Sequence, residues 1–252
     1  MHRNPPARTF SALLILIGLF CAASTGQIKG LATRTTDNFR FRYDRNVRDP
    51  DIRKVGKLLQ VLLAEYSGRL GIPLRRKVDV YAFSTSGRYQ SDSKSSVYDD
   101  ASFRDGKIYL NVSAVLKADT SQSNPLARVV SDAILNELKW CPRWVAELYG
   151  MYAGKDLDRF GTPAQTRGAS FSDLTEDYAR ADNPKDLAEI HAKLAATVRF
   201  LVDRYGQQKV EQMYRHFSRP STLDNVFESA FGEKMPVIEK AWSEALRVPP
   251  KG

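Results

Sequence analysis

The chain has 252 residues, of which 42% are hydrophobic and 27% are charged. This composition is that of an ordinary globular protein, and it excludes a wholly disordered, collagen-like or disulfide-stapled chain. The formal net charge is +9, and the basic residues are scattered along the chain rather than gathered in one run. This excess favours anionic partners, but it is too small and too dispersed to indicate nucleic-acid binding.

The first 24 residues have the three parts of a secretory signal peptide. Arg3 and Arg8 precede an apolar run over 10–21, and small residues follow at 22–24. The run is shorter than the roughly 20 residues that span a bilayer. We therefore predict cleavage and an exported protein, periplasmic or extracellular, without a transmembrane span; a retained membrane anchor is the alternative. Cleavage leaves Cys141 as the one cysteine and hence no internal disulfide.

The first half of the mature chain predicts a sheet with one long helix. The predicted order is strand, helix, strand and hairpin, over residues 39–43, 49–70, 77–83 and 101–112. The strands alternate between apolar and polar side chains, whereas the helix has apolar residues at helical spacing. Pro50 near the start of this helix and Gly71 at its end are typical of helix boundaries. Asp105 and Gly106 form a hairpin turn signal.

The second half predicts a helical region. Helices are predicted at 124–140, 142–154 and 187–205, with two or three shorter ones between 210 and 242. The stretch 155–183 is rich in Gly, Thr, Ser and Asp and predicts a loop with short helical turns. Strands followed by helices, without βαβ alternation, predict an α+β fold. We expect a small N-terminal mixed sheet with a helix, then a helical lobe, in one domain over 25–248 with a tail at 249–252. The cleft is expected between sheet and lobe.

Two carboxylates interrupt apolar faces on two consecutive predicted helices. Glu137 continues an apolar stripe that ends at Trp140, and Glu147 lies between Trp144 and Met151 at helical spacing. A carboxylate in an apolar stripe is uncommon without a partner or a role. We therefore expect the two carboxylates to face each other or a common cleft.

The segments around these carboxylates resemble the gluzincins, a group of peptidase MA-like metallopeptidases. The zinc helix of the family carries H-E-x-x-H, to which residues 136–140 (NELKW) correspond, and the next helix carries P-x-W-[LV]-x-E-G-x-A, to which residues 142–150 (PRWVAELYG) correspond. Residues 199–206 are similar to a further helix of the family. The resemblance implies a zincin-like fold, with Glu137 as general base and Glu147 as third zinc ligand.

The two zinc-binding histidines of the family motif are replaced here by Asn136 and Trp140. In active relatives, imidazoles at i and i+4 bind a zinc ion that lowers the pKa of its water to about 7. Asn is a poor zinc ligand and Trp is none, so we expect no metal and no cofactor. We predict a catalytically inactive protein with Glu137 as a vestigial base. The binding cleft is expected to contain Asn136, Trp140, Trp144 and Glu147.

A cleft of this kind can hold an extended peptide through main-chain hydrogen bonds to a strand edge. We expect that edge at 107–112, above an acidic floor. The predicted partner is a peptide or protein segment, and the basic excess favours an anionic envelope component as another. The protein would then be a binding or assembly module of the envelope, or a regulator of active relatives.

Other interpretations stay open at this point. The two carboxylates are ordinary surface acids if they pair with Lys139 or Arg143, and they could also form a glycosidase-type pair. An active hydrolase or metallopeptidase with a non-standard metal site would recruit Asp132 or His191, the latter being otherwise a core histidine. A structural protein without a cleft function is a further alternative.

Overall fold

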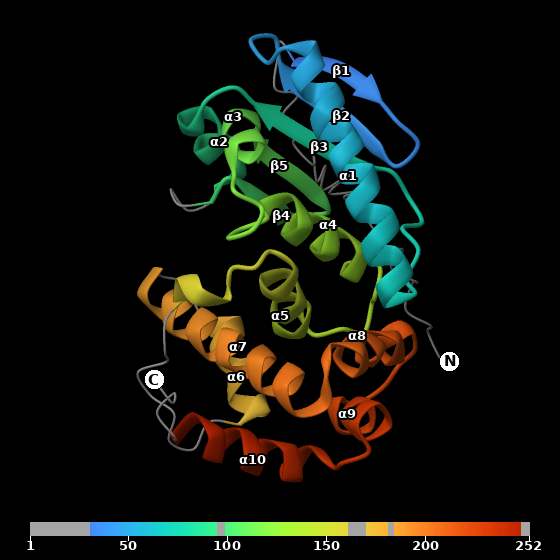
Figure 1. The fold of residues 1–252 in the computed structure, drawn as a ribbon, viewed down its shortest axis with the longest axis vertical. Coiled ribbons are helices and arrows are strands. Elements are labelled where there is room, and N and C mark those ends of the chain that lie inside the picture. Colours follow the sequence, from blue (N-terminus) through green and yellow to red (C-terminus); the bar gives the residue numbers. More distant parts are fainter. Residues whose placement is uncertain (1–30, 95–98, 161–169, 181–183, 248–252) are drawn as a thin grey trace, which may run out of the picture.

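A five-stranded mixed sheet forms the N-terminal half of the fold (Figure 1). The computed structural model describes residues 31–94, 99–160, 170–180 and 184–247, so the predicted signal peptide and tail lie outside the described residues. The strands are β1 (Leu31–Thr35), β2 (Phe39–Asp44), β3 (Val78–Phe83), β4 (Ala101–Arg104) and β5 (Lys107–Asn111). Their order is β1-β2-β3-β5-β4, with β2, β3 and β5 parallel and each edge strand antiparallel to its neighbour.

Helices are inserted between the strands and then make up the second half. The sheet half contains α1 (Asp49–Leu70), α2 (Ser86–Ser93) and α3 (Val112–Lys117). The second half contains α4 (Pro125–Leu135), α5 (Arg143–Ala153), α6 (Phe171–Arg180), α7 (Pro184–Tyr205), α8 (Gln207–Arg215), α9 (Leu223–Phe231) and α10 (Met235–Arg247), with short 3-10 helices at Leu157–Phe160 and His216–Ser218. The predicted α+β class, with a mixed sheet followed by helices, is confirmed. Of the helices described, none combines the length and the apolar character that crossing a membrane requires.

The helix α1 connects two parallel strands and covers one face of the sheet (Figure 1). Parallel neighbours need a crossover connection, which this 22-residue helix supplies. The expectation that the chain has no βαβ alternation is therefore wrong, because β2, α1 and β3 form such a unit. Side chains on the inner face of the sheet, including Phe41, Val80 and Ile108, are fully buried.

The strand edge that faces the helical half is β4 rather than β5. β5 pairs with β3 on one side and with β4 on the other, so the prediction of an exposed edge at 107–112 is wrong. The hairpin signal itself is confirmed. Asp105 and Gly106 form a two-residue turn with φ values of 50° and 73°, the conformation that hairpins with two-residue loops prefer.

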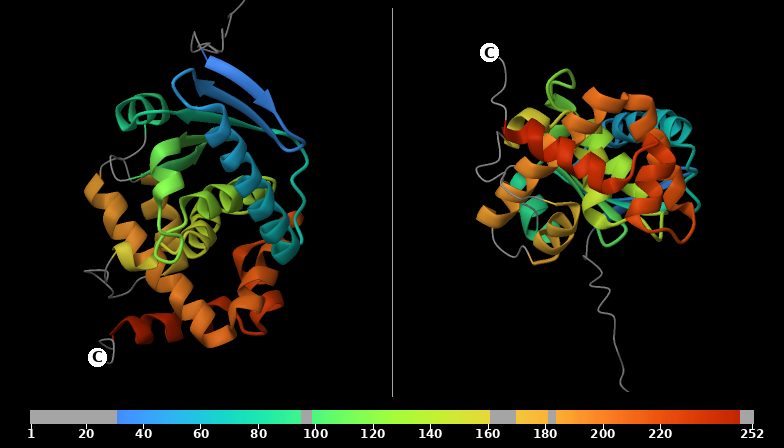
Figure 2. Two further views of the ribbon diagram at one scale, coloured as in Figure 1. Left: turned by 45° about the horizontal axis from the view of Figure 1, so that its top comes forward. Right: turned by 90° about the horizontal axis from the view of Figure 1, so that it is seen from below.

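The helices α4 and α5 lie in the middle of the molecule, between the sheet half and the remaining helices (Figure 2). α4 packs against α1, β4 and α5, and α5 packs in turn against α7. The buried apolar side chains of both halves form one continuous core. Side chains that α4 and α5 direct toward each other therefore lie deep in the fold.

The helix α4 ends earlier than predicted, at Leu135 rather than near residue 140. Beyond it, the backbone N–H groups of Glu137 and Leu138 donate to carbonyl groups three residues back, which is the tighter pattern common at helix ends. Pro142 stands just before α5, so the chain must leave the first helix and turn within a few residues. The stripe predicted to carry Glu137 and Trp140 therefore does not continue the helix.

Candidate functional site

A cleft opens where the β4–β5 hairpin approaches the end of α4 and the start of α5. It consists of two neighbouring cavities. The first cavity, of about 420 Å³, is bounded by the hairpin, α4, α5 and Tyr178 of α6. The second cavity, of about 380 Å³, lies between the hairpin, the start of β3 and the end of α4. Phe103 and Asn136 line both cavities.

The predicted site residues are divided between the cavities, the surface and the core. Glu147 lines the first cavity and Glu137 the second, so the two carboxylates do not share one cavity. The Trp140 side chain is 44% exposed and lines neither cavity. Trp144 is buried, stacks on Phe171 at 5.9 Å and donates its indole N–H to Thr175. Trp144 therefore belongs to the core behind the cleft.

Glu137 is held by an ion pair that the sequence did not indicate. Its Oε1 lies 3.8 Å from Nε of Arg76, in the segment just before β3, and its side chain is only 11% exposed. The neighbouring Lys139, one of the predicted partners, lies instead 5.1 Å from the centre of the Trp140 ring. Glu137 is therefore linked to the sheet half rather than to its own helix.

The second carboxylate, Glu147, belongs to a buried network of charges centred on Arg128 of α4. Arg128 donates from Nη2 to Glu147 Oε1 at 2.5 Å and from Nη1 to Asp156 Oδ2 at 3.4 Å. Asp156 also accepts from Ser123 at 3.0 Å and from Arg159 at 3.2 Å. Side-chain exposure is 15% for Arg128, 17% for Glu147 and 2% for Asp156. One guanidinium thus joins α4, α5 and the turn that follows α5.

Asp132 lies one helical turn after Arg128 and also lines the first cavity. Its carboxylate rests against the backbone of α5 at Gly150, where an added Cβ atom would overlap Asp132 Oδ1. Burial, and then the negative charge of Glu147, raise the pKa of Asp132 well above its ordinary value, although Arg128 opposes this shift. Asp132 therefore retains its proton at pH values at which an exposed aspartate has lost it.

The opposite shift occurs at Glu147. Burial opposes its ionisation, but the charges of Arg128 and His191 and the hydrogen bond from Arg128 outweigh burial and lower its pKa. His191 Nε2 lies 4.0 Å from Glu147 Oε1, and its ring contacts Phe160 edge-on. Burial lowers the pKa of His191, against the attraction of Glu147. The cluster therefore combines a glutamate whose ionised form is favoured, an aspartate whose protonated form is favoured and a histidine whose neutral form is favoured.

These residues do not fit the zinc ion that the family resemblance implies. Two side chains at i and i+4 on α4 do face a glutamate on α5, but they are Arg128 and Asp132, not Asn136 and Trp140. A guanidinium is always cationic and is not a metal ligand, and it fills the space next to Glu147. Within the described ranges, no group of three His, Cys, Asp or Glu side chains is arranged to hold a metal ion.

Arg128, Asp156 and Tyr178 are the site residues that sequence reasoning missed. A signal for the first was present, since Arg128 and Asp132 are the two charged residues of a mostly apolar helix, at i and i+4 spacing. Such a pair on a buried helix indicates a partner on a neighbouring element. Asp156 and Tyr178 both lie in the predicted loop over 155–183 and carried no comparable signal.

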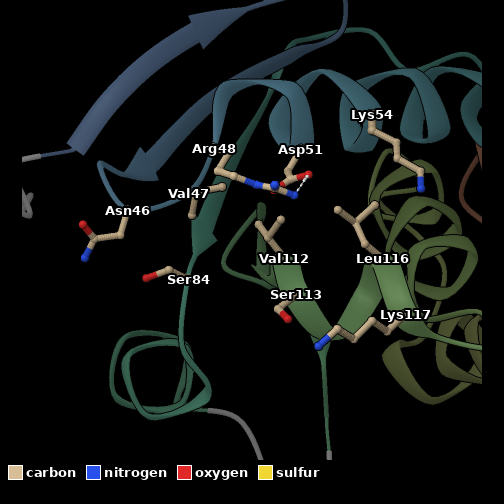
Figure 3. Close-up of a pocket in the computed structure, with 10 residues that line it drawn as sticks. All are labelled: Asn46, Val47, Arg48, Asp51, Lys54, Ser84, Val112, Ser113, Leu116 and Lys117. Atoms are coloured by element: carbon tan, nitrogen blue, oxygen red, sulfur yellow. Dashed lines mark hydrogen bonds and ion pairs between the residues drawn. The ribbon is translucent and has the colours of Figure 1, made fainter.

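A third cavity, of about 450 Å³, lies at the carboxyl ends of the parallel strands (Figure 3). Ligands often bind at this edge of a parallel sheet. Arg48 and Asp51 pair with each other there at 2.8 Å, and Lys54 and Lys117 flank the opening. These basic side chains are exposed. The cleft instead contains the largely buried Glu147 and Asp132, whose pKa values are shifted by their surroundings. We therefore place the candidate site in the cleft.

No protein-family model matches the sequence, and a search of curated proteins finds no significant match.

Proposed function

We propose that the protein is an exported, non-catalytic relative of the peptidase MA-like metallopeptidases that binds an extended peptide or protein segment in the cleft. The observation that carries the proposal is the Arg128–Glu147 ion pair at 2.5 Å. In the zincin-like arrangement implied by the resemblance, this space between consecutive helices holds the metal. An arginine there satisfies the acidic side chain without a metal ion.

The carboxylates of the cleft support binding rather than hydrolysis. A general base must be free to take a proton from water. Glu147 is ionised but hydrogen-bonded to Arg128, which lowers its pKa and its basicity. Glu137 is paired with Arg76. Glu137 and Glu147 thus each have an arginine partner, which opposes the role of general base.

The free edge of β4 offers the main-chain groups that an extended ligand needs. A two-residue turn closes on a hydrogen-bonded pair, Arg104 and Lys107, and hydrogen-bonded and non-bonded pairs alternate along an antiparallel ladder. The N–H and C=O groups of Phe103 therefore point away from β5. Within the described part of the chain no hydrogen bond is made to them. A segment lying along β4 would pass directly over the two cavities, both of which Phe103 lines.

The edge is tested by removing one main-chain donor. A mixture of fluorescently labelled, unstructured decapeptides is titrated with the wild-type protein and with Phe103→Pro, which lacks the N–H group. Phe103→Ala is the matched control, because it loses the ring but keeps the donor. We expect the proline variant to lose about tenfold in affinity, the value of one well-formed hydrogen bond, beyond any loss in the alanine variant. Equal affinities of the two folded variants would overturn pairing along β4.

Catalysis is tested separately on the same protein. We expect no hydrolysis of the peptides above background and no bound transition metal by mass spectrometry after mild exposure to zinc. About one equivalent of zinc, lost in Glu147→Ala, would instead support the alternative of an active hydrolase with a non-standard metal site. Zinc-independent hydrolysis that is lost in Glu137→Gln would equally overturn the non-catalytic proposal.

A further inference from the structure

The charge that a ligand meets in the cleft differs from the charge obtained by counting the acidic and basic residues that line it. Six basic side chains line the two cavities: Arg76, Lys77, Arg104, Lys107, Lys139 and Arg143. Five acidic side chains line them as well: Asp79, Asp105, Asp132, Glu137 and Glu147. By this count the cleft is nearly neutral, and the sequence alone favoured an acidic floor. The partners of the individual acids decide which charge a ligand meets.

The negative charge of each acid in the first cavity is reduced by other groups of the protein. Glu147 is paired with Arg128, which lies behind the cavity wall and is not one of its lining residues. Asp132 ionises less readily than an exposed aspartate, because burial and the charge of Glu147 raise its pKa. Asp105 lies 3.6 Å from Arg104, its neighbour in the hairpin. An incoming ligand therefore finds little negative charge available on this wall.

Part of the acidity of the second cavity is offset in the same way. Asp79 lies 3.5 Å from Arg40 and 3.9 Å from Arg42, both on β2 and outside the cavity lining. Glu137 is paired with Arg76. Glu147 and Asp79 are thus paired with arginines outside the cavity lining, whereas Glu137 and Asp105 are paired with arginines that line it. Among the residues that the structure describes, several other lining cations have no carboxylate within ion-pair distance.

Two of those cations stand at the mouth of the first cavity. Arg143 is the first residue of α5 and Lys139 lies in the turn before it; both are exposed and line the cavity. In the ranges that the structure describes, no carboxylate lies within ion-pair distance of either one. Arg143 lines the cavity and is close enough to Glu147 to lower the pKa of that carboxyl. Lys139 contacts the face of Trp140.

From this arrangement we infer that the cleft selects an extended segment that carries carboxylates, which bind Arg143 and Lys139 while its backbone pairs with β4. This inference rests on the proposed function and names the class of its ligand. Side chains alternate along an extended segment, so every second one would point toward the helical wall of the cleft. Arginine binds carboxylates through two parallel hydrogen bonds, and the carboxylate can come from Asp or Glu side chains or from a chain terminus.

The test uses four labelled decapeptides of one sequence pattern. Three have blocked ends and carry Glu, Gln or Lys at every second position, and the fourth is the Gln peptide with a free C-terminal carboxylate. Fluorescence anisotropy with the full protein at low salt gives each affinity. Two exposed ion pairs should make the Glu peptide about fivefold tighter than the blocked Gln peptide, and higher salt should reduce this difference. If the free terminus is the carboxylate that binds, the fourth peptide should instead bind more tightly than the blocked Gln peptide.

The variants identify the cations responsible. Arg143→Gln and Lys139→Gln should each lower the affinity for the Glu peptide about twofold and leave that for the blocked Gln peptide unchanged. Lys117→Gln, which removes an exposed lysine beside the third cavity, should change neither affinity. Equal binding of the Glu, Gln and Lys peptides would overturn the selectivity and leave peptide binding intact. Absence of binding by all four would overturn the proposed function itself.

Discussion

At the scale of single residues, two arginine–carboxylate pairs have the same separation and very different surroundings. Both Arg128–Glu147 and Arg199–Asp158 have a closest N–O distance of 2.5 Å. The side chains of the first pair are 15% and 17% exposed, and those of the second are 37% and 99% exposed. Burial rather than distance should therefore decide what each pair contributes to stability, because removal of one partner leaves a buried charge in the first case only.

We expect Arg128→Met to lower the free energy of unfolding by about 3–5 kcal/mol, the usual consequence of breaking a buried pair from one side. Arg199→Met, the matched control, should lower it by no more than about 1 kcal/mol. Urea denaturation of the three proteins measures both values. Replacing Glu147 by Leu in the Arg128→Met background should restore part of the loss. Equal losses in the two single variants would contradict the buried network.

The raised pKa of Asp132 makes a prediction about pH. Its folded-state pKa is above that of the unfolded chain because of burial and Glu147, with Asp156 adding to the shift and Arg128 opposing it. The folded state therefore binds more protons, and the contribution of this group to stability falls as pH rises above about 4. In Asp132→Asn this loss is absent. The variant should gain stability relative to wild type from pH 4 to pH 8 in urea titrations, and a constant difference would contradict the shift.

Of the central ion pair of the site, the sequence identified the glutamate but not the arginine. Glu147 could be predicted because a carboxylate among apolar residues on a helix needs a partner, and it has one. The partner itself could not be predicted from the periodicity of one helix. Arg128 meets Glu147 only because α4 and α5 pack against each other, and Glu137 leaves that interface because α4 ends at Leu135. The helix end thus decided which acid lies in the charge network.

At the scale of elements, those with strong apolar periodicity were predicted and those stabilised by their neighbours were not. The 22-residue α1 and the strands β2 and β3 follow from their own patterns. β1 has no buried residue and is an edge strand held by pairing with β2. α2 is strongly polar and buries only Tyr89 and Ser93. Parallel pairing across α1 depends on the tertiary fold and was missed for the same reason.

The close approach of α4 to α5 predicts opposite effects for two helical glycines. A Cβ atom at Gly150 would overlap the Asp132 carboxylate, whereas one at Gly68 of α1 meets no atom within 4 Å beyond its own stretch of helix. Gly150→Ala should lower the free energy of unfolding by about 1–3 kcal/mol through overpacking. Gly68→Ala should raise it by about 0.5–1 kcal/mol, because alanine has the higher helix propensity. Thermal or urea unfolding gives both changes, and stabilisation in both variants would contradict the close contact.

At the scale of the whole molecule, the sheet and the helical half are joined by polar contacts as well as by the core. Glu211 of α8 is 7% exposed and accepts hydrogen bonds from Arg69 of α1 and from Tyr149 of α5. Arg215 of α8 donates to the carbonyl groups of Arg69 and Leu70 at the end of α1. These contacts join α8 to α1 and α5, and α5 forms part of the wall of the cleft.

This continuity can be tested because all three tryptophans, Trp140, Trp144 and Trp242, lie in the helical half. Val80 of β3 is fully buried in the sheet half, and Val80→Ala should lower stability by about 2 kcal/mol through loss of apolar contacts and the cavity left behind. If the protein unfolds as one unit, the tryptophan fluorescence midpoint in urea should shift together with that of far-UV circular dichroism. Val61→Ala, at a site that is 65% exposed, should shift neither. If the fluorescence midpoint stays in place while the dichroism midpoint moves, the two halves unfold independently. The cleft between them would then lack the fixed geometry that selective peptide binding requires.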